Sequence, residues 1–151
     1  MSVRIERLYE LPAERVSPMI EESERAGLGF VRRLAEEWAS GRNRFDRAGE
    51  VMLGALMGSR LIGVCGLNID PYAGGPDVGR VRHLYVLASH RRQGVARQLV
   101  GAVIEAARGP FVTLRLRTTN EAAARLYESL GFRRQAGDQH CSHLMGLPRR
   151  R

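Results

Sequence analysis

The stretch from Arg80 to Val103 combines residue types that suit the binding of an anion. Leu84–Leu87 is apolar and favours a strand, Arg91–Gly94 interrupts that run, and apolar residues recur at helical spacing from Val95. A strand that passes through a glycine turn into a helix directs several backbone N–H groups to one point. Because a helix N-terminus has unpaired donors and a favourable dipole, this pattern predicts an anion site.

Asn120, Tyr127 and His83 are further residues whose types could do chemistry. Asn120 stands where it would cap a helix, and Tyr127 lies on the apolar side of that helix, where an aromatic ring would pack on a sheet. His83 has an ordinary pKa close to neutral. Cys65 and Cys141 do not have a metal-ligand spacing, so we expect two small buried thiols, no disulfide and no metal site.

Strands and helices of ordinary length must position these residues. Apolar runs predict six strands besides Leu84–Leu87, over residues 3–8, 50–57, 61–69, 111–117, 132–135 and 141–147. Helical spacing predicts a helix that starts at Pro12 or at Ser17-Pro18, and further helices over 30–41, from 95 to the Gly109-Pro110 break, and over 120–131. This order favours a mixed α/β sheet with helices on both faces.

The length of 151 residues suggests one domain over 1–151, large enough to bury a sizeable core. Hydrophobic residues make up 44% of the chain and charged residues 26%, as in ordinary globular proteins. The chain has no apolar run long enough to span a bilayer, and its first residues lack a signal-peptide core. We therefore expect a cytoplasmic protein without a membrane partner.

The formal net charge of +8 raises the hypothesis of a nucleic-acid partner. All 24 basic residues are arginine, however, which indicates a bias towards arginine codons, as in GC-rich bacteria. The arginines are scattered, and only Arg91-Arg92 and the tail at 149–151, which we expect to be a solvated end, form clusters. The positive charge still favours an acidic ligand such as a nucleotide phosphate. Because no aromatic platform lies between the basic residues, we do not expect that ligand to be a nucleic acid.

Two motifs in their strand contexts resemble the GNAT superfamily of acyl-CoA-dependent N-acetyltransferases. The first motif, Arg91-x-x-Gly94-x-Ala96, follows the strand that ends in Leu84-Tyr85-Val86. The second, NEAAARLYESLGF over residues 120–132, follows the strand predicted over 111–117. The resemblance covers nearly the whole chain and is strongest over 82–132. It implies a single α/β domain with a mixed, mostly antiparallel sheet of six to seven strands, flanked by about four helices and splayed between the fourth and fifth strands. A homodimer would also be in keeping with the family.

The resemblance implies transfer of an acetyl group from acetyl-CoA to a primary amine of a small molecule or peptide, by direct attack through a tetrahedral intermediate. In the family, the loop matching 91–96 holds the pyrophosphate and the pantetheine arm pairs with the strand matching 84–87. The amide of Val86 or of Leu87 would face the thioester carbonyl, and Tyr127 matches the tyrosine beside the CoA sulfur, which implies a general acid. The residues expected to bind acetyl-CoA are Leu84, Tyr85, Val86, Leu87, Arg91, Arg92, Gln93, Gly94, Val95, Ala96, Arg97, Asn120 and Tyr127.

The general base is the point at which this chain departs from the family. Many members carry a glutamate on the central strand where this chain has Arg80. His83 is the nearest titratable candidate, either as the catalytic base or as a polar residue that lines the slot. Asp70, Asp77 and Glu50 are further options, and a base acting through water, or an amine that arrives neutral, would need none of them.

Four arginines, at positions 80, 82, 115 and 117, are expected to border the acceptor end of the slot. They would disfavour a polycationic acceptor and favour one that bears a carboxylate or a phosphate. Two other functions stay open at this point. One is an acyl-CoA-binding sensor of the same fold that lacks catalysis, and the other is a basic nucleic-acid-binding module.

Overall fold

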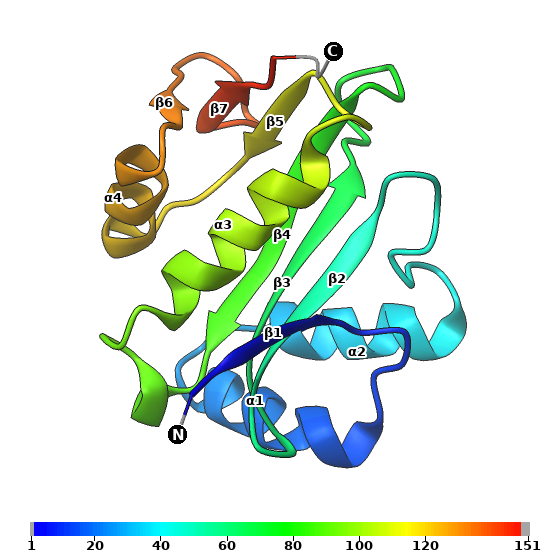
Figure 1. Ribbon diagram of the computed structural model, residues 1–151, viewed down its shortest axis with the longest axis vertical. Coiled ribbons are helices and arrows are strands. Elements are labelled where there is room, and N and C mark those ends of the chain that lie inside the picture. The colour runs from blue at the N-terminus through cyan, green and yellow to red at the C-terminus, as the bar shows by residue number, and fades with distance from the viewer. Residues whose placement is uncertain (1, 149–151) are drawn as a thin grey trace.

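A mixed sheet of seven strands forms the centre of the molecule in the computed structural model, which describes residues 2–148 (Figure 1). The arginine tail at 149–151 lies outside the described residues. The sheet has the order β1-β2-β3-β4-β5-β7-β6, in which β4 and β5 are parallel and the other neighbours antiparallel. The strands are β1 (Arg4–Arg7), β2 (Val51–Met57), β3 (Arg60–Ile69), β4 (Val78–Val86), β5 (Thr113–Leu116), β6 (Arg133–Arg134) and β7 (His143–Gly146).

Four α-helices within the described residues cover the two faces of this sheet. Helix α3 (Val95–Ala107) lies in front of the sheet in Figure 1, whereas α1 (Ala13–Arg25) and α2 (Phe30–Ser40) lie behind it. Helix α4 (Glu121–Ser129) follows β5 and lies beside α3. None of the helices in the described part of the chain is long and apolar enough to cross a membrane.

The core lies between the sheet and its helices and follows the predicted apolar spacing. Val95, Leu99 and Val103, which form the stripe of α3, are all buried. Cys65 and Cys141 are buried and free, which confirms that neither forms a disulfide with the other.

The gap between β4 and β5 is built into their pairing. The two strands share three residue pairs, from Val78 with Thr113 to Arg80 with Arg115. Beyond Arg80 the strands diverge, and β4 continues to Val86 with no strand of residues 2–148 paired to it on that side (Figure 1). Strand number, helix number and this splay confirm the predicted fold class. An unpaired strand edge inside a sheet can accept an extended ligand, which adds its own backbone-like hydrogen bonds.

A β-bulge at His83 changes the course of β4 within this open stretch. The register advances by two residues on β3 but by three on β4, so that His83 and Leu84 both face Cys65. His83 has a φ of 60°, a left-handed conformation in which histidine occurs more often than most other non-glycine residues. Strained backbone of this kind is concentrated at functional sites, so the bulge marks the open edge as a candidate site.

Local signals at the helix ends agree with the structure. Gly41 and Gly131 follow α2 and α4 with φ values of 81° and 108°, which only glycine adopts readily. Asn120 caps α4, because its Oδ1 accepts a hydrogen bond from the Ala123 N–H at 2.9 Å. Of the two predicted starts of the first helix, the structure has the earlier one, directly after Pro12.

Candidate active site

A pocket of about 340 Å³ lies where β4 turns into α3. Gly94 caps α3 with a φ of 82°, so the unpaired first N–H groups of that helix lie at this pocket. The predicted anion site therefore coincides with a cavity, which α4 closes on its other side. The lining residues are Val86, His90, Arg91, Arg92, Gly94, Val95, Ala96, Arg97, Ala122 and Leu126.

Six predicted acetyl-CoA contacts lie outside this lining, namely Leu84, Tyr85, Leu87, Gln93, Asn120 and Tyr127. Three lining residues were not predicted, namely His90, Ala122 and Leu126. Ala122 and Leu126 are four residues apart, which places them on one face of α4. That helical spacing is the signal from which they could be identified.

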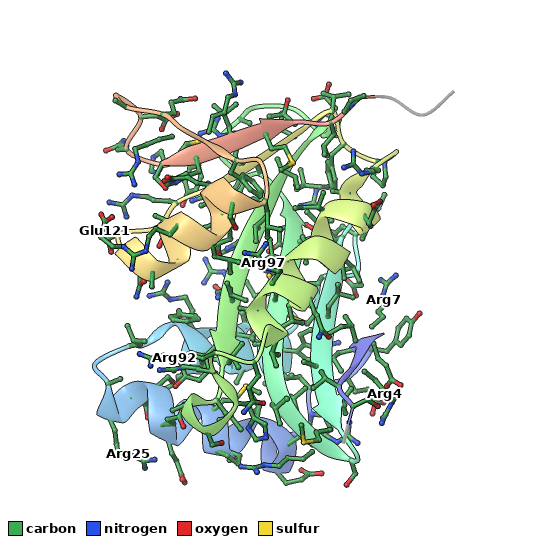
Figure 2. The ribbon with its side chains drawn as sticks, turned by 60° about the vertical axis from the view of Figure 1, so that its left-hand side comes forward. Arg4, Arg7, Arg25, Arg92, Arg97 and Glu121 are labelled. Atoms are coloured by element: carbon green, nitrogen blue, oxygen red, sulfur yellow. The ribbon has the colours of Figure 1, made fainter. Side chains whose placement is uncertain are left out.

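The three arginines of the predicted anion site lie in different directions. Arg92 is exposed on the turn, and Arg97 lies between α3 and α4, where its Nη2 donates to Ser129 Oγ at 2.9 Å (Figure 2). Arg91 turns back towards the protein, and its Nε donates to the Val86 carbonyl at 2.9 Å. Within the described residues no carboxylate pairs with Arg92 or Arg97, so their charges are the two that can act on an anion in the pocket.

Glu22 of α1 belongs to this site but was not found by sequence reasoning. Its carboxylate accepts hydrogen bonds from the Tyr85 hydroxyl and from the Ala88 N–H, the latter at 3.1 Å, and lies 3.7 Å from Arg91 Nη2. Burial alone would raise the pKa of Glu22, but these hydrogen bonds and the charge on Arg91 lower it below its usual value. Glu22 thereby fastens α1 to the turn before α3. No pattern in the sequence distinguishes it from the neighbouring acidic residues.

The open edge of β4 decides which backbone amide is available to a ligand. In antiparallel pairs, residues alternate between directing their N–H and C=O groups at the neighbouring strand and directing them away. The Leu87 N–H donates to the Ile62 carbonyl at 2.9 Å, so β3 already uses it. Val86 precedes it and therefore directs its backbone groups into the splay. Of the two amides predicted to face a thioester, only that of Val86 is left available.

Tyr127 of α4 is buried next to the sheet. Its ring meets that of Phe132 edge to face, with 5.6 Å between centroids. Within residues 2–148 its hydroxyl makes no hydrogen bond. Burial raises the pKa of Tyr127 well above its usual value, and the nearby Cys65 thiol is the second cause. The phenol is therefore protonated, and can act as a donor, throughout the neutral range.

His83 lies between two aromatic rings on the α2 side of the sheet. Phe30 stacks on it with 6.1 Å between centroids, and Phe45 meets it edge to face at 6.0 Å. Its Nε2 is buried and has no hydrogen-bond partner among the described residues. Burial, followed by the charges of Arg82 and Arg33, lowers the pKa of His83 to about 3. The imidazole is therefore neutral near pH 7 and a much weaker base than an ordinary histidine.

Arg80, which stands where the resemblance implies a glutamate, is held by contacts with other parts of the fold. Its Nη1 donates to the His140 carbonyl at 2.7 Å and to Asp70 Oδ2 at 3.3 Å. Arg115 lies 3.5 Å from the same Asp70 oxygen and pairs with Asp138 at 2.9 Å. The charges of Arg80 and Arg115 are thus neutralised within the protein. Of the four arginines expected at the acceptor end, these two are not free to attract a ligand.

The remaining carboxylates considered for a base have differing surroundings. Both oxygens of the buried Glu50 accept hydrogen bonds, Oε1 from the Arg47 N–H at 3.2 Å and Oε2 from Asn68 Nδ2 at 3.0 Å and the Ile69 N–H at 2.8 Å. Asp77 is exposed in the loop before β4. Glu50, like Asp70, is engaged in contacts that hold the fold together.

The arrangement fits a ligand with a diphosphate at one end and an extended amide chain at the other. The pocket at α3 offers unpaired amides and two free arginines to the anion. The open β4 edge offers the Val86 backbone to an extended chain. Acetyl-CoA has both parts, so the residues present are suited to it.

Comparisons with known proteins bear on this fit. The sequence model of the acetyltransferase (GNAT) family matches residues 8–132. The N-alpha-acetyltransferase RimI of Mycobacterium tuberculosis is 35% identical over 89 residues, which cover 54% of this chain and 51% of that protein. The chain thus matches about half the length of this curated relative.

Solved structures share the fold over nearly the whole chain. A proposed acetyltransferase from Exiguobacterium sp. 255-15 has a TM-score of 0.86 at 26% identity, and the match covers 97% of this chain and 94% of that one. A GNAT-family acetyltransferase from Staphylococcus aureus Mu50 has a TM-score of 0.75 at 13% identity, covering 97% and 100%, and its likeness shows the fold alone. Because the family match spans most of the sequence and the fold agrees, the chain belongs to the acetyltransferase (GNAT) family.

Proposed function

We propose that this protein is an N-acetyltransferase that moves an acetyl group from acetyl-CoA to a primary amine of a small molecule or peptide. The observation that carries the proposal is the continuity between the open edge of β4 and the pocket at the start of α3. That continuity suits a molecule whose pantetheine arm joins a pyrophosphate to a thioester. Family and fold support an acyltransferase activity.

Backbone amides at the start of α3 would hold the pyrophosphate, with Gly94 allowing a close approach and Arg92 and Arg97 adding positive charge. The pantetheine arm would add to the β4 edge as an extra strand. Arg91 Nε already donates a hydrogen bond to the Val86 carbonyl. A pantetheine arm that pairs with this carbonyl must therefore displace the Arg91 side chain. The displaced guanidinium would then be available to the phosphates.

The reaction forms a C–N bond at the acetyl carbonyl carbon and breaks the C–S bond of the thioester. The Val86 N–H donates to the oxygen that becomes negative in the tetrahedral intermediate. The Tyr127 hydroxyl donates to the departing sulfur, and the proton that the attacking nitrogen loses balances the one that the thiolate takes up. Since a free thiol has a pKa of about 8.5, this donor assists departure without being a strong acid.

The amine must be neutral when it attacks. Arg82 and Arg33, whose charges act on His83, also disfavour an ammonium group close by and so lower the pKa of a bound amine. We assign to the unpartnered Nε2 of His83 the role of accepting a hydrogen bond from that amine. With a pKa of about 3, His83 orients the amine while water takes the proton. This role is narrower than that of the general base predicted from the sequence.

The description of the M. tuberculosis relative suggests which acceptor amines to test first. The M. tuberculosis protein is described as an N-alpha-acetyltransferase, so we propose α-amines as the first acceptors to examine. The cytoplasmic location and the homodimer stay predictions.

A thiol-release assay against small amines, amino acids and peptides tests the proposed function. We expect thiol release that depends on an amine, with the acetylated amine detected by mass spectrometry. If acetyl-CoA binds in calorimetry but no amine in a broad panel is acetylated, the sensor function replaces this one. If acetyl-CoA does not bind and nucleic acid binds with a steep salt dependence, the protein is a nucleic-acid-binding module and not an acetyltransferase.

A further inference from the structure

A second pocket, of about 350 Å³, opens on the side of the sheet that carries α2. Its wall consists of Glu37 of α2, residues of the 41–50 connection, and the end of β3 around Asn68. Arg82 of β4 completes it. Arg82 directly precedes His83 at the bulge, so this residue connects the pocket to the part of β4 that lies beyond its pairing with β5.

Arg82 is the arginine of β4 whose charge the protein leaves without a partner. In the described chain, no carboxylate lies within 4 Å of its guanidinium, in contrast to Arg80, which pairs with Asp70. Its hydrogen bond is a long one of 3.4 Å, from Nη1 to Asn68 Oδ1. Burial lowers the pKa of Arg82 below its usual value, which shows that the charge has lost part of its hydration.

The other charged groups of the pocket do not supply the missing anion. The Glu50 carboxylate is saturated by neutral donors, among them Asn68, and Asn68 in turn contacts Arg82. Glu37 and Asp46 also line the pocket but form no ion pair with Arg82 within 4 Å in the described residues, and the more distant charge of Glu37 does not offset the effect of burial on Arg82. Arg44 donates to the Trp38 and Ala39 carbonyls and so completes the end of α2. A partly buried guanidinium without an anion is costly, and a ligand that brings one removes that cost.

We propose that the acceptor is a small amine that also carries a carboxylate, and that Arg82 binds this carboxylate in the second pocket. A guanidinium binds a carboxylate through two parallel hydrogen bonds, which fixes the orientation of the bound molecule as well as its position. A volume of about 350 Å³ is at the small end for ligand pockets and suits a molecule of amino-acid size. The proposal rests on the proposed acetyl transfer, for which it names the class of acceptor.

Matched acceptors that differ only at the carboxylate test the proposal. Free amino acids are compared with their carboxamides, which keep the amine and side chain but lose the negative charge. We expect the wild type to favour the carboxylate form by about 100-fold in kcat/KM, the effect of roughly 2.7 kcal/mol of lost binding. The Arg82→Gln variant should lose this preference, because its rate falls much further on the carboxylates than on the carboxamides, which lose only the effect of a nearby positive charge on the amine. The Arg82→Lys variant should retain part of it, since charge remains without the planar fork.

Arg60→Gln, which removes an exposed arginine at the start of β3, is the matched control and should keep the wild-type preference. Calorimetric titration of the favoured amino acid, without acetyl-CoA, provides a readout that does not depend on turnover. Equal rates on both acceptor forms, or an equal loss on both in Arg82→Gln, would overturn the proposal. If no amine turns over, acetyl transfer itself fails, and the titration still decides whether Arg82 binds a carboxylate. Acetylation of peptides alone would also contradict it.

Discussion

Val86 and Tyr127 contribute to the proposed chemistry in different ways. Val86 acts through its backbone N–H, which faces the splay because the neighbouring Leu87 amide is bonded to Ile62. A side-chain substitution at Val86 would therefore change the packing but leave the donor in place. Tyr127 acts through a hydroxyl that can be removed without touching the backbone. Of the two, Tyr127 is thus the residue at which mutation tests the mechanism.

Replacing Tyr127 by phenylalanine should lower kcat by about 100-fold, the usual size of a lost proton donor. The KM for acetyl-CoA should stay the same, because the hydroxyl contributes to departure of the sulfur. The melting temperature should change little, since the hydroxyl makes no hydrogen bond within residues 2–148. Thiol-release kinetics and thermal denaturation measure these effects. Tyr9→Phe, at a tyrosine that is 77% exposed, is the control, and wild-type kcat in Tyr127→Phe would remove Tyr127 from the mechanism.

His83 should make stability depend on pH in the acidic range. The pKa of His83 is about 3 in the folded protein, against 6.5 for a histidine exposed to water. Between these two pH values the unfolded chain binds a proton at His83 and the folded protein does not. The stabilisation is complete above pH 6.5 and is lost as the pH falls towards 3. Between pH 8 and pH 4.5 this loss amounts to about 2–3 kcal/mol.

The His83→Asn variant isolates this effect, because asparagine tolerates the positive φ at the bulge but does not titrate. Denaturant unfolding at pH 8 and pH 4.5 gives the change in the free energy of unfolding with pH for each protein. Comparing the two changes removes any packing penalty of the substitution that does not depend on pH. The variant should lose about 2–3 kcal/mol less than the wild type on acidification. Equal losses in the two proteins would mean that His83 becomes protonated without unfolding.

Residue identities were predictable from the sequence where the signal is local. Gly94 and Tyr127 could be found because each stands at a fixed spacing from other motif residues. The left-handed bulge at His83 could not, since it arises from the pairing register between β3 and β4. The engagement of Arg80 with Asp70 was equally hidden, because the two residues are ten positions apart and the loop between β3 and β4 brings them together.

The turn between β4 and α3 is the element on which donor binding depends. Gly94 has a φ of 82°, and an added Cβ would meet no heavy atom within 4 Å. A substitution there therefore acts through backbone conformation rather than through a clash with the protein. Gly101, in the middle of α3, has the same open surroundings but an ordinary helical backbone. The two glycines form a matched pair on one helix.

Alanine at the two positions should have opposite effects. Gly94→Ala should lower the free energy of unfolding by about 1 kcal/mol, because an L-residue is strained in the left-handed region. It should also raise the KM for acetyl-CoA, since a methyl group enters the space next to the helix amides. Gly101→Ala should instead stabilise the protein by about 0.5–1 kcal/mol, with the KM unchanged. Chemical denaturation and steady-state kinetics measure both, and an unchanged KM in Gly94→Ala would argue against the pyrophosphate site.

Elements were predicted well where their limits are set by nearby residues. The hairpin of β2 and β3 and the glycine ends of α2 and α4 agree with the structure. The start of α1 stayed undecided, because Pro12 and Pro18 are both compatible with a first turn and tertiary packing makes the choice. The link from Glu22 to the turn before α3 was out of reach for the same reason, since it joins segments 66 residues apart.

On the scale of the whole molecule, the splay divides the sheet into two parts. Strands β1–β4 form one part and β5–β7 the other, and three residue pairs, from Val78 with Thr113 to Arg80 with Arg115, join them in the described part of the chain. The buried Asp70 reinforces this junction, since its carboxylate lies between Arg80 of β4 and Arg115 of β5. The same feature that opens the site for a ligand thus gives this ion cluster a part in holding the two halves of the sheet together.

Replacing Asp70 by asparagine should therefore destabilise the junction as well as the fold. The change leaves the buried Arg80 and the partly buried Arg115 without their shared carboxylate, which costs about 3–5 kcal/mol. Asp138→Asn is the matched control, because that side chain is 30% exposed and solvent screens its ion pair with Arg115, so its loss should cost much less. Hydrogen exchange should show the largest loss of protection in β5 and β7 of Asp70→Asn, beyond the loss in β2 and β3. Uniform loss across the sheet would mean that the two parts unfold as one unit and that Asp70 stabilises them equally.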